Sequence, residues 1–160
     1  SYVQILKSPL MMELKQMIDH SGISCSGIIV ELTESGYLEG TPAVRSVWND
    51  MKQLRIQIAL DDFGTGYSNL MNISNLEPDI VKLDRGFTLK ALSRSYEYQL
   101  MQYVIEMVHK LNQYVCVEGV ETKEDLEKIK ALGPDLIQGY YYSKPCSRNE
   151  FLKKFFCYSE

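Results

Sequence analysis

Histidine and cysteine are scarce in this sequence, and their spacing argues against a zinc site and against a disulfide framework. Only two histidines occur among 160 residues, at the distant positions 20 and 109. The four cysteines are Cys25, Cys116, Cys146 and Cys157, and no two of them are spaced as Cys-x-x-Cys. We therefore expect reduced thiols in a cytosolic protein, and we interpret both histidines as ordinary helix residues.

Other absences narrow the class of protein further. No apolar run approaches the ~20 residues that a membrane-spanning helix needs. A net charge of −4 argues against a broad basic surface for polymeric nucleic acid. It does not exclude a small phosphate ligand, because bound metal ions can supply positive charge. No glycine-rich fingerprint follows the first expected strand, so a dinucleotide-binding sheet is poorly supported.

Short apolar runs alternate with longer amphipathic runs along the whole chain. Strands are expected over residues 27–34, 56–62, 78–84, 114–121 and 135–143. Helices are expected after residue 9 and over residues 41–54, 96–112 and 122–133, with a last helix after the capping box Ser147–Glu150. In the helix over 96–112, the residues expected to face inward are Leu100, Met101, Val104, Ile105, Val108 and Leu111. This alternation predicts an α/β fold with parallel strands and right-handed crossovers.

Polar residues recur where the expected strands end. They are Glu31 and Glu34, Asp61 and Asp62, Lys82 and Asp84, Glu118 and Glu121, and Gln138, on the first to the fifth strand respectively. Taken singly, each has an ordinary interpretation, such as a turn, a helix cap or a solvated side chain. Because the carboxyl ends of successive parallel strands meet at one mouth, their joint occurrence indicates an active site of a (β/α)₈ barrel.

The adjacent carboxylates of Asp61 and Asp62 repel each other and resist desolvation at the end of an apolar strand. A bound cation would offset both effects. Oxygen ligands without convergent histidine or cysteine favour Mg²⁺ or Mn²⁺ over zinc. A pair of such ions activates water and stabilises in-line displacement at phosphorus, and a nearby lysine neutralises charge on the phosphate.

Five motifs of this sequence match one family in the family's own order, and they cover most of the chain. They are "ELTES", "LDDFGTGYSNL", "VKLDRGF", "VEGVET" and "QGYYYSKP". The chain resembles the EAL domain, a cyclic di-GMP phosphodiesterase. The resemblance implies a TIM-like (β/α)₈ barrel, of which this chain would supply about the last five β/α units.

The resemblance also implies a role for each matching residue. The metal ligands would be Glu31, Asp61, Asp62 and Asp84, holding Mg²⁺ or Mn²⁺, two ions in all. Lys82 would contact the catalytic water, and Glu118 would be the general base or its support. Glu121 and Gln138 would line the site. The implied reaction is hydrolysis of one phosphodiester bond of cyclic di-GMP to give linear pGpG.

Further implications concern the surroundings of the site. Glu34 would anchor the loop over residues 63–69, which couples dimerisation to activity in the family, so a homodimer is expected. Residues 1–160 would be the C-terminal part of a single EAL domain, because the Glu-Ala-Leu strand of the family lies before the first matching motif. Opening at Ser1 without an initiator Met, the chain is expected to be a fragment of a longer protein.

Three interpretations of function stay open at this point. The first is an active cytoplasmic phosphodiesterase, whose parent protein could carry a sensor or GGDEF domain, or a membrane anchor, in another region. The second is a catalytically inactive EAL-like receptor that binds cyclic di-GMP and relays the signal. The third is a different metal-dependent (β/α)₈ hydrolase that shares only the geometry.

Overall fold

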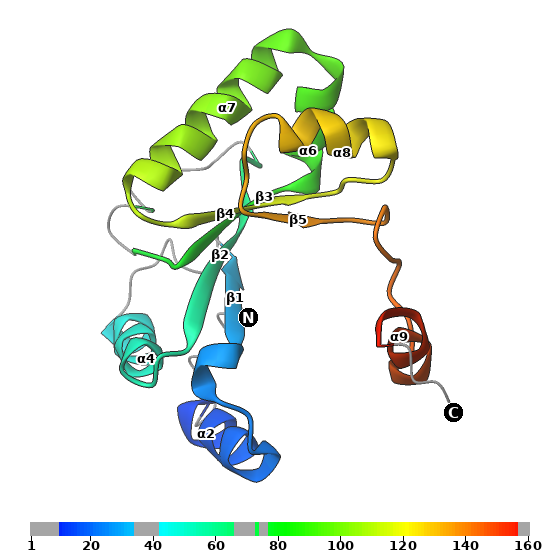
Figure 1. The fold of residues 1–160 in the computed structure, drawn as a ribbon. Coiled ribbons are helices and arrows are strands. Elements are labelled where there is room, and N and C mark those ends of the chain that lie inside the picture. The colour runs from blue at the N-terminus through cyan, green and yellow to red at the C-terminus, as the bar shows by residue number, and fades with distance from the viewer. Residues whose placement is uncertain (1–9, 34–41, 66–72, 74–76, 157–160) are drawn as a thin grey trace.

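Strands and helices alternate along the chain, as the sequence pattern predicts (Figure 1). The computed structural model describes residues 10–33, 42–65, 73 and 77–156. The strands are β1 (Ile29–Thr33), β2 (Gln57–Phe63), β3 (Ile80–Leu83), β4 (Tyr114–Glu118) and β5 (Leu136–Gln138). The helices are α2 (Leu10–Ser21), the 3₁₀ turn η1 (Cys25–Gly27), α4 (Pro42–Gln53), α6 (Arg85–Ser93), α7 (Ser95–Lys110), α8 (Lys123–Lys130) and α9 (Arg148–Phe155).

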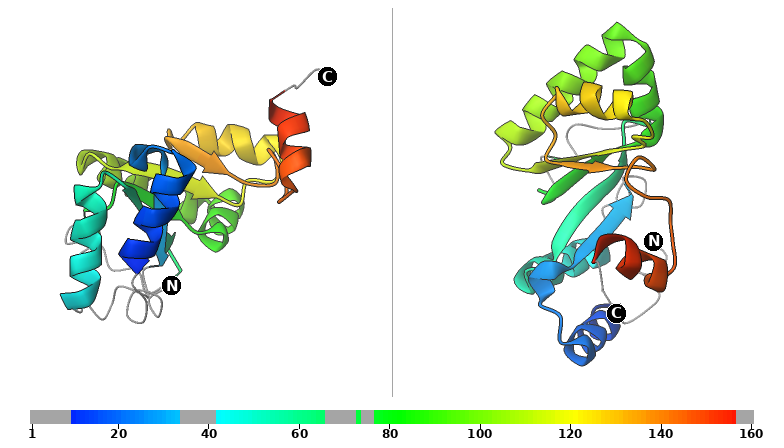
Figure 2. Two further views of the ribbon diagram at one scale, coloured as in Figure 1. Left: turned by 90° about the horizontal axis from the view of Figure 1, so that it is seen from below. Right: turned by 45° about the vertical axis from the view of Figure 1, so that its right-hand side comes forward.

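The five strands form one parallel sheet, and their order in space is their order in the sequence. Figures 1 and 2 show the strand direction turning progressively from β1 to β5. Sequential parallel strands with this strong twist are the arrangement of neighbouring βα units in a TIM barrel. The predicted α/β class with a partial (β/α) barrel is therefore confirmed.

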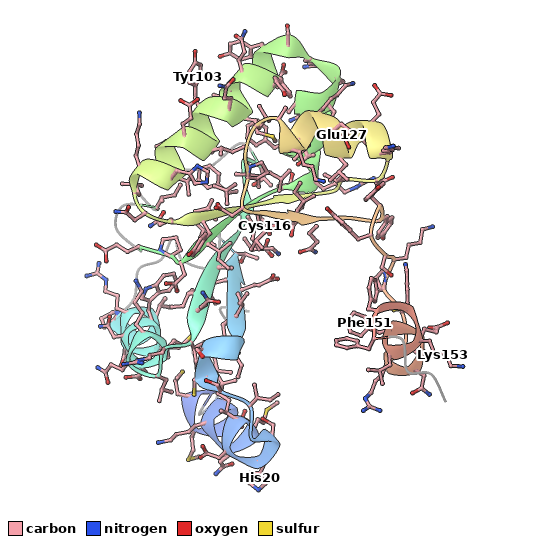
Figure 3. All side chains as sticks on the ribbon, in the orientation of Figure 1. His20, Tyr103, Cys116, Glu127, Phe151 and Lys153 are labelled. Carbon is pink, nitrogen blue, oxygen red and sulfur yellow. The ribbon has the colours of Figure 1, made fainter. Side chains whose placement is uncertain are left out.

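The two faces of the sheet carry different side chains, because successive residues of a strand point to opposite sides. On one face, apolar residues are completely buried and pack with residues of the helices in the main core; they are Ile58, Leu60, Val81, Leu83, Val115 and Val117. The opposite face, which we call the inner face, carries a small separate apolar cluster of Ala59, Ile80 and Cys116. Figure 3 shows Cys116 at the centre of the sheet. Nearly all charged residues of the sheet lie on this inner face.

The inner face is partly open at the amino ends of its strands. Ile29, Tyr114 and Leu136 are 46%, 54% and 45% exposed, although each belongs to a strand of the sheet. Helix α9 lies beyond β5 and away from the other helices (Figures 1 and 2), and none of its residues is buried. Among the described residues, no helix is long and apolar enough to cross a membrane.

Helix α6 was not anticipated, because residues 85–93 lack a strong apolar stripe. Asp84 starts this helix, and its Oδ1 atom accepts a hydrogen bond of 2.7 Å from the backbone N–H of Gly86. The capping box expected at Ser147 before α9 is confirmed, and the helix expected from residue 122 begins with a capping box of its own at Thr122. The helix expected over 96–112 forms as α7, but Leu100 and Leu111 are 42% and 43% exposed, so their inward assignment is wrong.

Strand β5 (Leu136–Gln138) lies within residues 135–143, where the fifth strand is expected. The chain leaves the sheet at Gly139, where the backbone passes directly against the backbone of Val120. A Cβ atom at position 139 would lie 2.6 Å from the Val120 nitrogen, so this close approach requires glycine. Beyond this point the chain turns away toward α9.

Two Pro-Asp pairs join neighbouring strands at their amino ends. The Oδ2 atom of Asp79 accepts a hydrogen bond of 2.8 Å from the N–H of Ile58 in β2. In the same way, Asp135 Oδ2 accepts one of 2.8 Å from Val115 in β4 and lies 2.9 Å from His109 Nε2. These aspartates fix the sheet at the end opposite the polar cluster described next.

Candidate active site

One buried lysine contacts carboxylates from three other strands of the sheet. Lys82 lies in β3 and is only 5% exposed. Its Nζ atom is 2.6 Å from Glu118 Oε1, 2.8 Å from Glu31 Oε1 and 3.0 Å from Asp61 Oδ1. These carboxylates belong to β4, β1 and β2, so four neighbouring strands build one cluster on the inner face. The structure thus brings together four of the residues that the sequence singles out.

The charge of Lys82 is maintained by these neighbours. Burial on its own lowers the pKa of Lys82, because an ammonium group is poorly solvated inside a protein. The close carboxylates of Glu118, Glu31 and Asp61 outweigh that effect and raise the pKa above its ordinary value. Lys82 is therefore a fixed cation at neutral pH, suited to donate hydrogen bonds or neutralise a phosphate but not to accept a proton.

Negative charge is nevertheless in excess at this cluster, since three carboxylates face a single ammonium group. The Oδ1 atom of Asp61 is buried and makes no hydrogen bond with any described residue. It lies 3.0 Å from Lys82 Nζ, with which it forms an ion pair. One ammonium group thus faces three carboxylates, and its single charge cannot neutralise all of them.

An irregularity in β2 determines the backbone conformation of Asp62, which follows Asp61. Asp62 has a positive φ of 62°, and the pairing of β2 with β3 shifts between Leu60 and Phe63. Its pKa is raised by burial and by the negative charges of Asp61 and Asp84, while Lys82 opposes the rise. The negative charges of Asp61 and Asp84 therefore disfavour the charged form of Asp62.

The chemistry of these donors fits a divalent cation of the Mg²⁺ or Mn²⁺ class. All of the donors are carboxylate oxygens, one of them is buried without a hydrogen bond, and their repulsion is what a cation would relieve. Within the described part of the chain, no three acidic, histidine or cysteine side chains surround a single point as a closed coordination shell. The donors are thus near one another but not arranged as a finished metal site.

The remaining predicted residues have separate surroundings. Glu121 accepts two contacts from Arg85, at 2.8 Å from Nη2 and 3.2 Å from Nε. Gln138 ends β5 and pairs in register with Glu118. Glu34 lies outside the described residues, as do most residues of the loop that it is expected to anchor.

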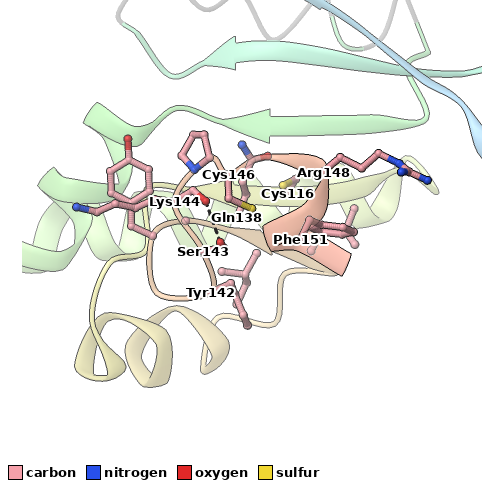
Figure 4. A pocket seen from close by; sticks show the side chains of 13 residues that line it. Cys116, Gln138, Tyr142, Ser143, Lys144, Cys146, Arg148 and Phe151 are labelled. Atoms are coloured by element: carbon pink, nitrogen blue, oxygen red, sulfur yellow. Dashed lines mark hydrogen bonds between the residues drawn. The ribbon is translucent and has the colours of Figure 1, made fainter. Parts of the chain in front are cut away.

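A groove of about 780 Å³ lies beside β5 and extends toward α9 (Figure 4). Its lining combines aromatic and cationic side chains with Gln138; they include Tyr140, Tyr142, Lys144, Arg148 and Phe151. Cys116 lines the same groove, and burial raises the pKa of its thiol to about 11. Cys116 is therefore a neutral thiol at physiological pH and does not act as a thiolate ligand or nucleophile.

Arg85 is the residue of this region that the sequence reasoning missed. It belongs to the quoted motif "VKLDRGF" and directly follows Asp84, but no role was assigned to it. The available signal was a cation three residues after Lys82, matched by a carboxylate three residues after Glu118.

Comparison with known proteins identifies the family. A family model of the EAL domain matches residues 2–145, and the chain belongs to this family. It is 30% identical over 142 residues to the cyclic di-GMP phosphodiesterase PdeL of Escherichia coli, covering 89% of this chain and 39% of PdeL. It is 28% identical over 152 residues to the cyclic di-GMP phosphodiesterase NbdA of Pseudomonas aeruginosa, covering 93% of this chain and 19% of NbdA. The chain thus spans about a fifth to two fifths of these curated relatives.

Solved structures give the same result for the fold. The EAL enzyme Bd1971, in its form with cAMP and cyclic di-GMP, superposes with a TM-score of 0.87 and 29% identity, over 94% of this chain and 40% of that one. The phosphodiesterase PaMucR, in complex with c-di-GMP, gives a TM-score of 0.85 and 27% identity, over 95% and 62%. BlrP1 of Klebsiella pneumoniae, in complex with manganese and cy-diGMP, gives a TM-score of 0.82 and 26% identity, over 89% and 36%.

Proposed function

We propose that this chain forms part of a metal-dependent phosphodiesterase that hydrolyses one phosphodiester bond of cyclic di-GMP to give linear pGpG. The observation that carries the proposal is the cluster of Glu31, Asp61 and Glu118 around the buried Lys82. The family membership and the names of the relatives PdeL and NbdA support the same substrate. The solved structures of the relatives PaMucR and BlrP1 are complexes with this nucleotide.

Four carboxylates are the residues that would hold the metal, namely Glu31, Asp61, Asp62 and Asp84. Two Mg²⁺ or Mn²⁺ ions, when bound, would supply a more acidic water and electrostatic stabilisation of the transition state. The buried Asp61 oxygen without a hydrogen bond and the repulsion between Asp62 and its neighbours support this assignment. The manganese in the BlrP1 complex supports the class of ion.

Lys82 and Glu118 would act on the reacting atoms. Hydrolysis forms a bond between water oxygen and phosphorus, breaks one bridging P–O bond, and moves a proton from the water to the leaving alcohol. Lys82, a permanent cation here, would stabilise negative charge that develops on the phosphate oxygens. Glu118, 2.6 Å from Lys82, would accept the proton of the water or hold the ammonium group in position.

The proposal also covers the rest of the domain and the protein to which this chain belongs. Residues 1–160 would form the C-terminal part of a single EAL domain, with further strands covering the exposed inner-face residues Ile29, Tyr114 and Leu136. The bifunctional relative MucR, named as both a diguanylate cyclase and a phosphodiesterase, supports a parent protein with a GGDEF domain. A cytoplasmic location and a homodimer complete the proposed setting, and a membrane anchor in the parent protein is compatible with it.

Substitution of Asp61 by Asn tests the proposal in the protein that carries these residues. We expect at least a hundredfold loss of pGpG formation with Mn²⁺ or Mg²⁺, since losses of about 10²–10³-fold are usual when one key electrostatic group is removed. The measurement is product formation by chromatography, with circular dichroism to verify folding. Asp19→Asn, on an exposed position of α2, is the matched control and should retain full turnover.

Three outcomes would change the conclusion. Unchanged turnover in Asp61→Asn would overturn the metal assignment. Binding of cyclic di-GMP by the unmodified protein without any product, in the presence of Mn²⁺, would instead indicate a receptor of the inactive EAL-like class. Turnover of simple phosphomonoesters in place of cyclic di-GMP would indicate a different barrel hydrolase.

A further inference from the structure

A second cation–carboxylate pair lies next to the catalytic one, between the same two segments of the chain. Lys82 reaches Glu118 within 2.6 Å, and three residues further along each segment Arg85 reaches Glu121. Both Nε and Nη2 of Arg85 donate to Glu121 Oε1, at 3.2 Å and 2.8 Å. The contact therefore fixes the direction of the guanidinium plane as well as its position.

The stem of the Arg85 side chain is held against the loop that leaves β4. Gly119, the first residue of that loop, has φ of 79°. A Cβ atom at Gly119 would lie 2.9 Å from Arg85 Cβ and 3.1 Å from Arg85 Cα. Glycine is required here both for the backbone conformation and for the space that Arg85 occupies. Arg85 thus contacts the loop twice, through Gly119 and through Glu121.

The opposite side of the same loop is joined to β5. The carbonyl oxygen of Val120 accepts a hydrogen bond of 3.0 Å from the N–H of Tyr141. The backbone of Gly139 also packs directly on Val120, as described for the end of β5. The segment from Glu118 to Glu121 is therefore fixed by β5 on one side and by Arg85 on the other.

Stability does not explain the Arg85–Glu121 pair. The two side chains are 58% and 39% exposed, and ion pairs with this exposure contribute little to folding. Their position is more informative, because Arg85 directly follows Asp84 and Glu121 follows Glu118 by three residues. An ion pair between the segment that carries Asp84 and the segment that carries Glu118 mainly affects how these two segments lie relative to each other.

We propose that Arg85 and Glu121 are positioning residues that hold Asp84 and Glu118 in the arrangement required for catalysis. The proposal rests on the phosphodiesterase function proposed above. It gives Glu121 a task other than contact with substrate, because Arg85 already occupies one of its carboxylate oxygens. Groups that orient the residues around a reaction centre commonly affect activity without touching the substrate.

A double-mutant cycle tests this role in the protein that carries the chain. The variants are Arg85→Ala, Glu121→Ala and the double variant, with kcat and KM measured for cyclic di-GMP. Each single variant should lower kcat by about 10- to 100-fold, the usual loss when such an orienting contact is removed. The double variant should be no worse than either single one, since both changes remove the same contact.

Amide hydrogen exchange at residues 119–121 provides a second readout that does not depend on turnover. Exchange should become faster in Arg85→Ala and Glu121→Ala, while Arg85→Lys, which keeps the charge but not the two-nitrogen contact, should be intermediate. The matched control is Arg94→Ala, which removes an exposed arginine paired with Glu97 at the other end of α6. It should change neither exchange at residues 119–121 nor the kinetic constants.

Three results would overturn the proposal. One is an increase in KM confined to Arg85→Ala with independent effects of the two substitutions, which would make Arg85 a phosphate contact. The second is unchanged kinetics, and the third is unchanged exchange in both single variants. If the unmodified protein shows no turnover, the phosphodiesterase proposal fails, whereas the exchange measurement still decides whether Arg85 and Glu121 fix the loop.

Discussion

At the scale of single residues, the properties of the site follow from one buried cation among several acids. Burial of Lys82, which is 5% exposed, disfavours its charge, and the carboxylates around it outweigh that effect. Those carboxylates in turn are more numerous than one ammonium group can neutralise, and Asp61 Oδ1 has no hydrogen bond among the described residues. The cluster is thus complete as a set of charges only when a further cation is present.

Replacing Lys82 by Met tests this balance of charges. The substitution removes the cation and leaves three carboxylates close together, so kcat should fall by about 10²–10³-fold. Because the carboxylates lose the one cation that pairs with them among the described residues, added Mn²⁺ should raise the melting temperature of Lys82→Met by more than it raises that of the unmodified protein. Differential scanning calorimetry with and without Mn²⁺ measures both values.

The control for this prediction is Lys90→Met, which removes an exposed lysine from α6. It should leave both the turnover and the response to Mn²⁺ unchanged. An equal Mn²⁺ response in Lys82→Met and the unmodified protein would show that the lysine and the metal do not share the same carboxylates.

At the scale of secondary-structure elements, the sequence was informative where a local signal exists. The capping boxes at Thr122 and Ser147 are defined by residues three positions apart, so they could be identified without any tertiary information. Helix α6 could not be identified in the same way, because residues 85–93 lack a strong apolar stripe to support the start signal at Asp84. Spacing alone also failed for Leu100, which is exposed because only one side of α7 contacts the sheet.

Similar reasons explain which parts of the site could be anticipated. The convergence of Glu31, Asp61, Lys82 and Glu118 follows from strand order, because parallel neighbouring strands place their carboxyl ends together. The contact of Arg85 with Glu121 depends instead on the direction of two loops and on the space above Gly119. Tertiary packing sets such close approaches. In the sequence, the only sign of them is a glycine at the position of contact.

The Pro-Asp pair before β5 leads to a prediction about stability and pH. Burial tends to raise the pKa of Asp135, but the N–H of Val115 and the ring of His109 outweigh it and lower the pKa. A depressed carboxylate pKa stabilises the fold above the unfolded value of about 3.9, and this contribution is lost as the pH falls through the folded value. Asp135→Asn should therefore reduce the free energy of unfolding by about 1 kcal/mol at pH 7.

Urea unfolding at pH 7, pH 5 and pH 3.5 measures the difference in the free energy of unfolding between the unmodified protein and Asp135→Asn. The difference in the free energy of unfolding should be smaller at pH 3.5 than at pH 5, because the aspartate of the unfolded chain binds a proton there and the contribution of the lowered pKa is being lost. The matched control is Asp50→Asn on an exposed position of α4. A difference that stays constant down to pH 3.5 would contradict a role for the charge of Asp135.

At the scale of the whole molecule, the two faces of the sheet are unequal. On the outer face, the apolar side chains of β2, β3 and β4 are completely buried and those of β1 and β5 are partly buried, whereas Ile29, Tyr114 and Leu136 are about half exposed on the inner face. Helix α9 carries Phe151 and Phe155, 45% and 46% exposed, and has no buried residue (Figures 1 and 3). Apolar groups on the inside of a curved parallel sheet are those that a closed barrel covers with its other strands.

Leu136→Asp tests this interpretation in the complete protein. If further strands of the barrel cover the inner face, the new carboxylate is buried without a partner, and the free energy of unfolding should fall by about 2 kcal/mol or more. Met17→Asp is the matched control, since Met17 is 69% exposed on α2 and should change stability by less than about 0.5 kcal/mol. Equal, small effects of both substitutions, measured by urea unfolding, would mean that Leu136 faces water in the complete protein. The inner face would then be open, and the cluster around Lys82 would function on an incomplete barrel.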